Sequence, residues 1–177
     1  MKNEKTVKLC ICALFAALTA VLSQISIPLP PIPINLATFS VFLAGALLGA
    51  KYGALSQTVY VLLGAIGVPV FSSFRGGIDV IVGPTGGYIV GYILAAALVG
   101  WIVDRYGLQI RVLVIAMFSG FLTYMICGTC YYMFLTKSGL IAALMACVVP
   151  FLIGDFLKMV LAIVLARKLR PILSKLK

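Results

Sequence analysis

The sequence predicts an all-α integral membrane protein with six transmembrane helices, in a single domain over residues 1–177. Hydrophobic residues make up 63% of the chain and charged residues only 10%, whereas a soluble domain carries about 25% charged residues. A transmembrane helix needs about 20 apolar residues, so 177 residues can form about six spans joined by short connections. This length leaves no room for a soluble ATPase or another catalytic domain.

The expected spans are apolar runs that end at turn residues. The first run begins after Lys8 and exceeds the roughly 7–15 apolar residues of a signal peptide, so we expect a retained helix. It ends at the proline-rich residues 28–33, which cannot continue a helix. A long glycine-rich loop, residues 69–87, is expected between the third and fourth spans, and Pro150 and Gly154 interrupt the last span. The six expected spans are residues 9–27, 36–50, 52–67, 88–103, 112–135 and 140–165.

The net charge of +10 indicates how the spans are oriented. Six spans place eleven of the 14 cations on the side of the two termini, and only Arg75 and Lys137 on the other side. Because basic residues gather in cytoplasmic loops, both termini are expected in the cytoplasm and the glycine-rich loop outside. The eleven cations are Lys2, Lys5, Lys8, Lys51, Arg105, Arg111, Arg167, Lys168, Arg170, Lys175 and Lys177. The sequence contains no basic stretch interleaved with aromatic residues, so we expect no nucleic-acid partner.

The amino-acid composition and the absence of known motifs make catalysis and the binding of a metal or another cofactor unexpected for this chain. The chain has no His, which is the commonest general base and metal ligand. Its five Cys all lie in apolar segments, where they are expected to pack as small apolar residues. The sequence also lacks a phosphate-binding P-loop and a nucleophile motif. We therefore expect a protein that is not an enzyme.

Asp155 and Lys158 lie inside the last expected span. An ionisable residue at the centre of a membrane costs about 2.5–3.5 kcal/mol on insertion scales. Because the two residues are three apart on a helix, they share one face. This spacing is compatible with an internal ion pair that neutralises itself. It is also compatible with a binding site for a polar, anionic solute, in which Lys158 meets a carboxylate and Asp155 accepts hydrogen bonds from N–H groups; the two roles can hold together.

The glycine-rich loop and the small residues of the first span allow two interpretations each. The loop is either a flexible surface loop or a re-entrant lid that carries Arg75 over a binding site. Glycines four residues apart, such as Gly45 and Gly49, favour close internal helix packing. The alanine stripe of the first span could serve internal packing or the docking of a partner membrane protein; it consists of Ala13, Ala16, Ala17 and Ala20.

Four motifs together resemble the BioY family, the biotin-specific S-components of energy-coupling-factor (ECF) vitamin transporters. The first is Leu-Ala-Gly-Ala-Leu-Leu-Gly-Ala-Lys-Tyr-Gly at 43–53, preceded by Pro-Ile-Pro-Ile at 31–34. The second is Gly-Val-Pro-Val-Phe at 67–71, leading to Arg-Gly-Gly at 75–77. The third is Gly-Pro-Thr-Gly-Gly-Tyr at 83–88, and the fourth is Pro-x-x-x-Gly-Asp-x-x-Lys at 150–158.

The resemblance implies a prokaryotic cell-membrane protein that captures biotin from outside. Uptake would be driven by an energy-coupling module of two cytoplasmic ATPases and a transmembrane coupling protein, with no cofactor on this chain. The resemblance assigns the alanine stripe to docking of the coupling protein. Some members carry Arg where this chain has Ile89, and many carry Gln where it has Ala37. The substrate-binding residues that it implies are Arg75, Asp155, Lys158, Gly76, Gly77, Gly86, Gly87 and Tyr88.

Two other functions remain open from the sequence. The chain could be an S-component for another small vitamin or for a biotin precursor. It could also be a self-sufficient secondary transporter in which Asp155 carries a proton.

Overall fold

The computed structural model describes residues 4–174, which fold into helices apart from one short β-hairpin. Five helices, α1, α2, α4, α5 and α7, are long and apolar enough to cross a membrane. Lys2, Lys175 and Lys177, which were counted for orientation, lie outside the described residues. The elements in order are α1 (Glu4–Gln24), β1 (Ser26–Ile27), β2 (Ile34–Asn35), α2 (Ala37–Ala65), the 3-10 turn η1 (Ser72–Phe74), α3 (Ile78–Val82), α4 (Gly86–Tyr106), α5 (Ile110–Thr136), α6 (Leu140–Cys147) and α7 (Val149–Ser174).

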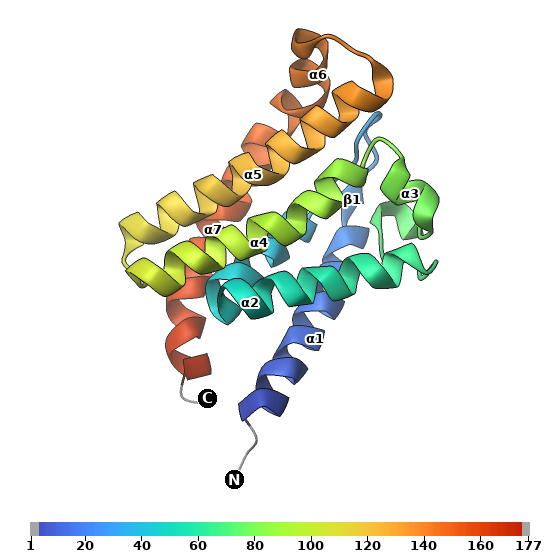
Figure 1. Cartoon of the computed structure of the whole chain (residues 1–177). Coiled ribbons are helices and arrows are strands. Elements are labelled where there is room, and N and C mark those ends of the chain that lie inside the picture. The colour runs from blue at the N-terminus through green and yellow to red at the C-terminus, as the bar shows by residue number, and fades with distance from the viewer. Residues whose placement is uncertain (1–3, 175–177) are drawn as a thin grey trace.

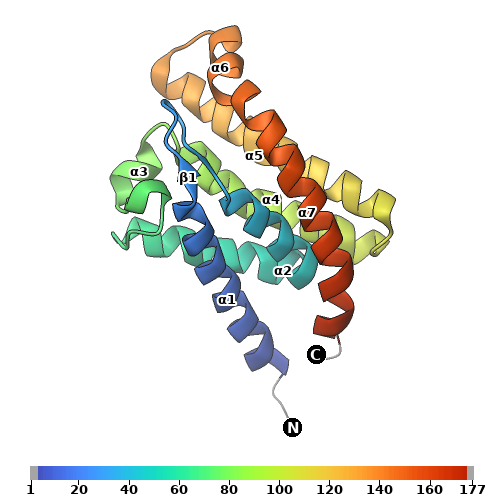
Figure 2. The same ribbon diagram turned by 180° about the vertical axis from the view of Figure 1, so that it is seen from behind.

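The helices form two layers (Figure 1). The second half of α2 lies beside α4, and α4 lies beside α5. Behind them, α1, the first half of α2 and α7 make the other layer (Figure 2). The first turn of α1 and the last turn of α7 lie at one end of the molecule in both views. The β1–β2 hairpin and α6 lie at the opposite end, which we call the hairpin end.

The second and third expected spans join in the single element α2, so the described chain has five long helices rather than six separate ones. The break between the two halves is at Gly49, whose φ of 82° is accessible to glycine at little cost. The Asp104 carboxylate accepts the N–H of Ala50 at 3.0 Å, which caps the second half, and it pairs with Arg170 of α7 at 2.6 Å. Gly45 and Gly53 meet across the break, which confirms that these glycines serve internal packing.

The last expected span is also divided, between α6 and α7. The break lies at Val148, before Pro150 rather than at it. Proline is tolerated in the first turn of a helix, where its missing N–H would have no partner, and Pro150 occupies that turn of α7. Gly154 lies within α7 and does not interrupt it, so the expected interruption at Gly154 is wrong. The expected loop of residues 69–87 is also more ordered than a simple connection, since it contains η1 and α3.

Candidate functional site

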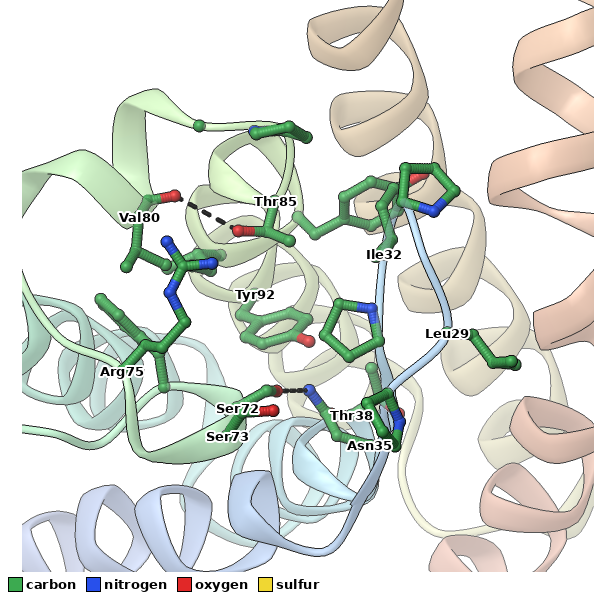
Figure 3. Close-up of a pocket in the computed structure, with 18 of the residues that line it drawn as sticks. Leu29, Ile32, Asn35, Thr38, Ser72, Ser73, Arg75, Val80, Thr85 and Tyr92 are labelled. Atoms are coloured by element: carbon green, nitrogen blue, oxygen red, sulfur yellow. Dashed lines mark hydrogen bonds between the residues drawn. The ribbon is translucent and has the colours of Figure 1, made fainter.

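A cavity of about 410 Å³ lies at the hairpin end of the bundle. One side is formed by the proline arm (residues 28–33), and another by the wall loop (residues 69–77), which follows α2. In the view of Figure 3, Ile32 and Arg75 lie on opposite sides of the Tyr92 ring, and Asn35 is hydrogen-bonded to Ser72. Helices α2, α3, α4, α5 and α7, together with Asn35 of β2 and residues 83–85, supply the remaining lining residues. The volume is in the range of about 300–1,000 Å³ that is typical of small-molecule sites.

Helix α7 directs its two ionisable residues inward because they lie on its buried stripe. The buried positions of this helix are spaced by three or four residues, which matches one face of an α-helix. Asp155 is 0% exposed and Lys158 is 5% exposed. The stripe consists of Phe151, Asp155, Lys158, Ala162 and Ala166.

The Asp155 carboxylate has three hydrogen-bond donors around it. Lys158 Nζ lies 2.7 Å from Oδ1, and the Thr38 hydroxyl donates to the same oxygen at 3.2 Å. The Tyr124 hydroxyl donates to Oδ2. The internal ion pair, one of the two interpretations from the sequence, is therefore present, and both of its residues are also among those that line the cavity.

Lys158 is held from a second side by the main chain of the hairpin. Its Nζ donates to the carbonyl oxygen of Asn35 at 2.6 Å. An ammonium group has three N–H donors, so two are engaged by residues of the described chain. Of the roughly four lone pairs of the Asp155 carboxylate, three accept hydrogen bonds from the described chain.

Aromatic side chains form the apolar wall of the cavity. The rings of Tyr88 and Phe151 are stacked, with centroids 6.4 Å apart and an interplanar angle of 14°. Tyr92 meets Tyr124 edge to face at 5.9 Å. The Tyr88 hydroxyl lies 3.2 Å from the Thr129 hydroxyl. The Tyr88 side chain is therefore held by a hydrogen bond at its hydroxyl as well as by stacking on Phe151. A flat or compact apolar skeleton can pack on such a surface.

A second ion pair lines the cavity, on its exposed side. Arg75 Nη2 lies 3.4 Å from Asp79 Oδ2, and the two side chains are 61% and 70% exposed. Exposed pairs of this kind hold each other weakly. Arg75 is therefore free to exchange its partner for a ligand at little cost.

The structure brings Arg75, Tyr88, Asp155 and Lys158 to one cavity, but none of the four predicted glycines is among its lining residues. The glycines instead allow close backbone packing next to the cavity. Gly76 packs on the Val68 carbonyl, Gly86 on the Ile81 carbonyl, and Gly87 on α5, while Gly77 has a φ of 112° and donates to the Gly64 carbonyl at 2.7 Å.

The alanine stripe is divided between two faces of α1. Ala13 and Ala17 are exposed, whereas Ala16 is only 2% exposed and belongs to the core. Ala20 is half-buried against that core. Of the four alanines, only Ala13 and Ala17 are therefore accessible at the surface of α1.

Several lining residues were not identified from the sequence. Asn35, Thr38, Tyr92 and Tyr124 all line the cavity, and three of them contact Asp155 or Lys158. A weak signal exists for Tyr124, since a tyrosine hydroxyl inside an apolar span needs a polar partner. Within the described chain, no group of three or more metal-binding side chains comes together.

The sequence is similar to those of known membrane transport proteins. The sequence matches the BioY family over residues 1–175. The probable biotin transporter BioY of Pyrococcus horikoshii is 39% identical over 169 residues, which cover 89% of this chain and 93% of that protein. Biotin transporter BioY2 of Lactococcus lactis subsp. cremoris is 32% identical over 174 residues, which cover 98% and 96%. The biotin transporter BioY of Thermotoga maritima is 52% identical over 92 residues. This match covers 52% of this chain and 54% of that protein, so it spans only about half of either.

The fold is also similar to a known crystal structure, that of the S-component for biotin from an ECF-type ABC transporter. The two structures superpose with a TM-score of 0.88 at 29% sequence identity, over 97% of this chain and 94% of that chain. Both the family match and this superposition extend over nearly the whole chain. The chain therefore belongs to the BioY family of multi-pass membrane proteins.

Proposed function

We infer that this chain is the biotin-binding S-component of an ECF-type transporter, a transport subunit with no catalytic activity. The observation that carries the inference is the buried Asp155–Lys158 pair in the wall of a cavity of about 410 Å³. Membership of the BioY family over residues 1–175 supports it. So does the whole-chain likeness to an S-component for biotin.

The cavity suits the chemistry of biotin. Biotin carries a ureido group with N–H donors, a compact ring skeleton and a carboxylate at the end of an apolar chain. Asp155 accepts a ureido N–H, and the rings of Tyr88 and Phe151 cover the skeleton. The carboxylate pairs with Lys158 or with Arg75, which are the two cations that line the cavity in the described chain. Gly76, Gly77, Gly86 and Gly87 contribute through the close backbone packing that shapes this side of the site.

Binding of labelled biotin to the purified chain tests this function. Asp155→Ala and Lys158→Ala are each expected to weaken binding at least tenfold, because each removes a charged partner of the ligand and leaves the other charge buried. Arg111→Ala removes an exposed cation outside the cavity and serves as the control. Unchanged affinity in both site variants would contradict the assignment. A similar loss in Arg75→Ala would place the ligand carboxylate at Arg75.

Competition experiments distinguish biotin from other ligands of the same class. Unlabelled biotin is expected to displace the label at the lowest concentration, ahead of dethiobiotin and unrelated vitamins. Tighter binding of dethiobiotin or of another vitamin would instead identify an S-component for that compound.

The chain crosses the membrane six times, as a single domain with both termini in the cytoplasm. The two halves of α2 count as separate passages, and α6 with α7 makes the last one. The first half of α2, residues 37–48, is only about 18 Å long. The preceding hairpin and proline arm complete that passage, because non-helical backbone is tolerated at membrane depth where it lines a cavity. The cations Lys51, Arg105 and Arg111 and those at the two ends of the chain favour the cytoplasm for the end with the termini.

The partners are a transmembrane coupling protein and two cytoplasmic ATPases. The exposed Ala13 and Ala17 leave a smooth face on α1 against which a helix of the coupling protein can pack closely. Reconstitution in liposomes tests this arrangement, since biotin uptake should require ATP and the ATPases. Uptake driven by a pH gradient without them would identify a secondary transporter instead.

A further inference from the structure

The wall loop contains a backbone turn that its own residues disfavour. Ser73 and Phe74 both have positive φ values, 61° and 55°, although neither is a glycine. Such conformations persist where surrounding contacts over-determine them. The Phe74 side chain is 72% exposed, so its burial does not fix the turn. The contacts that do so come from the neighbouring helix α1.

Gln24, the last residue of α1, contacts the wall loop with both polar atoms of its side chain. Its Oε1 accepts the N–H of Phe74 at 2.9 Å, and its Nε2 donates to the carbonyl of Phe71 at 3.1 Å. Next to it, the Ser23 hydroxyl donates to the carbonyl of Val70 at 2.5 Å. A side-chain amide carries an acceptor oxygen and a donor NH2 group, whereas an ionised carboxylate only accepts. The site therefore discriminates Gln from an otherwise isosteric Glu.

The other side of the wall loop faces the cavity. Ser72 Oγ accepts a hydrogen bond from Asn35 Nδ2 at 2.5 Å, which links the loop to the hairpin (Figure 3). The carbonyl of the same Asn35 holds Lys158 Nζ. Arg75 lies in the loop and lines the cavity, and its N–H and carbonyl both pair with Phe71. A continuous series of hydrogen bonds thus runs from α1, through the wall loop, to the buried ion pair.

From these contacts we propose that Gln24 is a positioning residue that fixes the wall loop against the cavity and thereby sets the rate at which the ligand leaves. It acts through Ser72 and Arg75 and does not itself line the cavity. Because Gln24 belongs to α1, a tilt of that helix moves the wall loop with it. The proposal rests on the proposed biotin-binding function for its ligand. The loop geometry itself can be tested without any ligand.

Hydrogen–deuterium exchange of the ligand-free, full-length chain tests the contact directly. In Gln24→Glu the carboxylate faces the Phe71 carbonyl with no proton to donate, so amides of residues 69–77 are expected to exchange about tenfold faster. Gln24→Met removes both hydrogen bonds without adding charge and should act alike, so the test holds even if the Glu variant folds poorly. Gln109→Glu makes the same chemical change at an exposed residue outside the cavity and should leave the wall loop unaffected.

A pulse–chase measurement of labelled biotin tests the functional consequence. In Gln24→Met the dissociation rate is expected to rise about tenfold, with the association rate nearly unchanged. Ser23→Ala should show a smaller rise, since it loses one contact with the same loop. Wild-type exchange at residues 69–77 together with wild-type release in a folded Gln24 variant would overturn the proposal. Failure of the wild-type chain to bind biotin would refute the proposed function, while the exchange experiment would still decide whether Gln24 fixes the loop.

Discussion

Replacing Asp155 by alanine is expected to destabilise the empty protein strongly. The Lys158 side chain is only 7% exposed, and its Nζ lies 2.7 Å from Asp155 Oδ1. At an effective dielectric constant of about 20, two unit charges 2.7 Å apart attract each other by about 6 kcal/mol. Part of this attraction offsets the desolvation of the two ions. Breaking a buried pair costs about 3–5 kcal/mol, which is the loss that we expect in the free energy of unfolding.

Thermal unfolding in detergent, without biotin, measures this loss. For a chain of this size it corresponds to a midpoint about 6–20 °C lower. Asp79→Ala is the matched control, because it breaks the exposed pair with Arg75 and should cost less than about 1 kcal/mol. The double variant Asp155→Ala/Lys158→Met removes both charges and should recover most of the stability without recovering biotin binding. An Asp155→Ala midpoint equal to the wild-type value would refute the buried pair.

Two further substitutions test the surroundings of the pair. Tyr124→Phe removes the hydroxyl that donates to Asp155 and should cost about 1.5–3 kcal/mol in the free energy of unfolding, measured by the same assay; a loss below about 0.5 kcal/mol would show that this hydrogen bond contributes little. Gly128→Ala places a methyl group against the Tyr88 ring and should cost about 1–3 kcal/mol as well as weaken biotin binding. Gly139→Ala, where a methyl group meets open space, is its control, and equal midpoints for the two alanine variants would contradict the close packing.

Hydropathy predicted the regular part of the fold well, because an apolar run of sufficient length has few alternatives to a helix. The expected spans 88–103 and 112–135 lie within α4 and α5. The breaks were harder to place. The turn at Gly49 depends on Asp104, 55 positions further along the chain, so local pattern indicated the two halves but not their geometry. A break before Pro150 is expected, because proline is tolerated in the first turn of a helix but disfavoured further along it. The connection between α6 and α7 at Val148 is seen only in the structure.

The ionisable residues of the candidate site could be identified from the sequence, because they lie in an otherwise apolar span. Asp155 and Lys158 stand out because a charged side chain in an apolar span has a high free-energy cost unless it is paired or serves a function. Thr38 and Asn35 do not stand out, because a hydroxyl or a main-chain carbonyl is unremarkable in any sequence. They reach the pair from 117 and 123 positions away. The contacts of Gln24 with the wall loop become visible only when the elements are packed.

The balance of charge in the cavity has a consequence for how a ligand arrives. In the described chain, the charged residues of the cavity lining are two cations and two acids, which pair with each other. Seen from bulk solvent the empty cavity is electrically neutral, so it has little long-range attraction for an anion despite the chain's charge of +10. Association is therefore expected to depend only weakly on ionic strength, unlike that of a steered encounter. In the proposed binding mode, selection occurs on contact, when the donor and the acidic group of the ligand replace the partners that the cavity charges have in the empty protein.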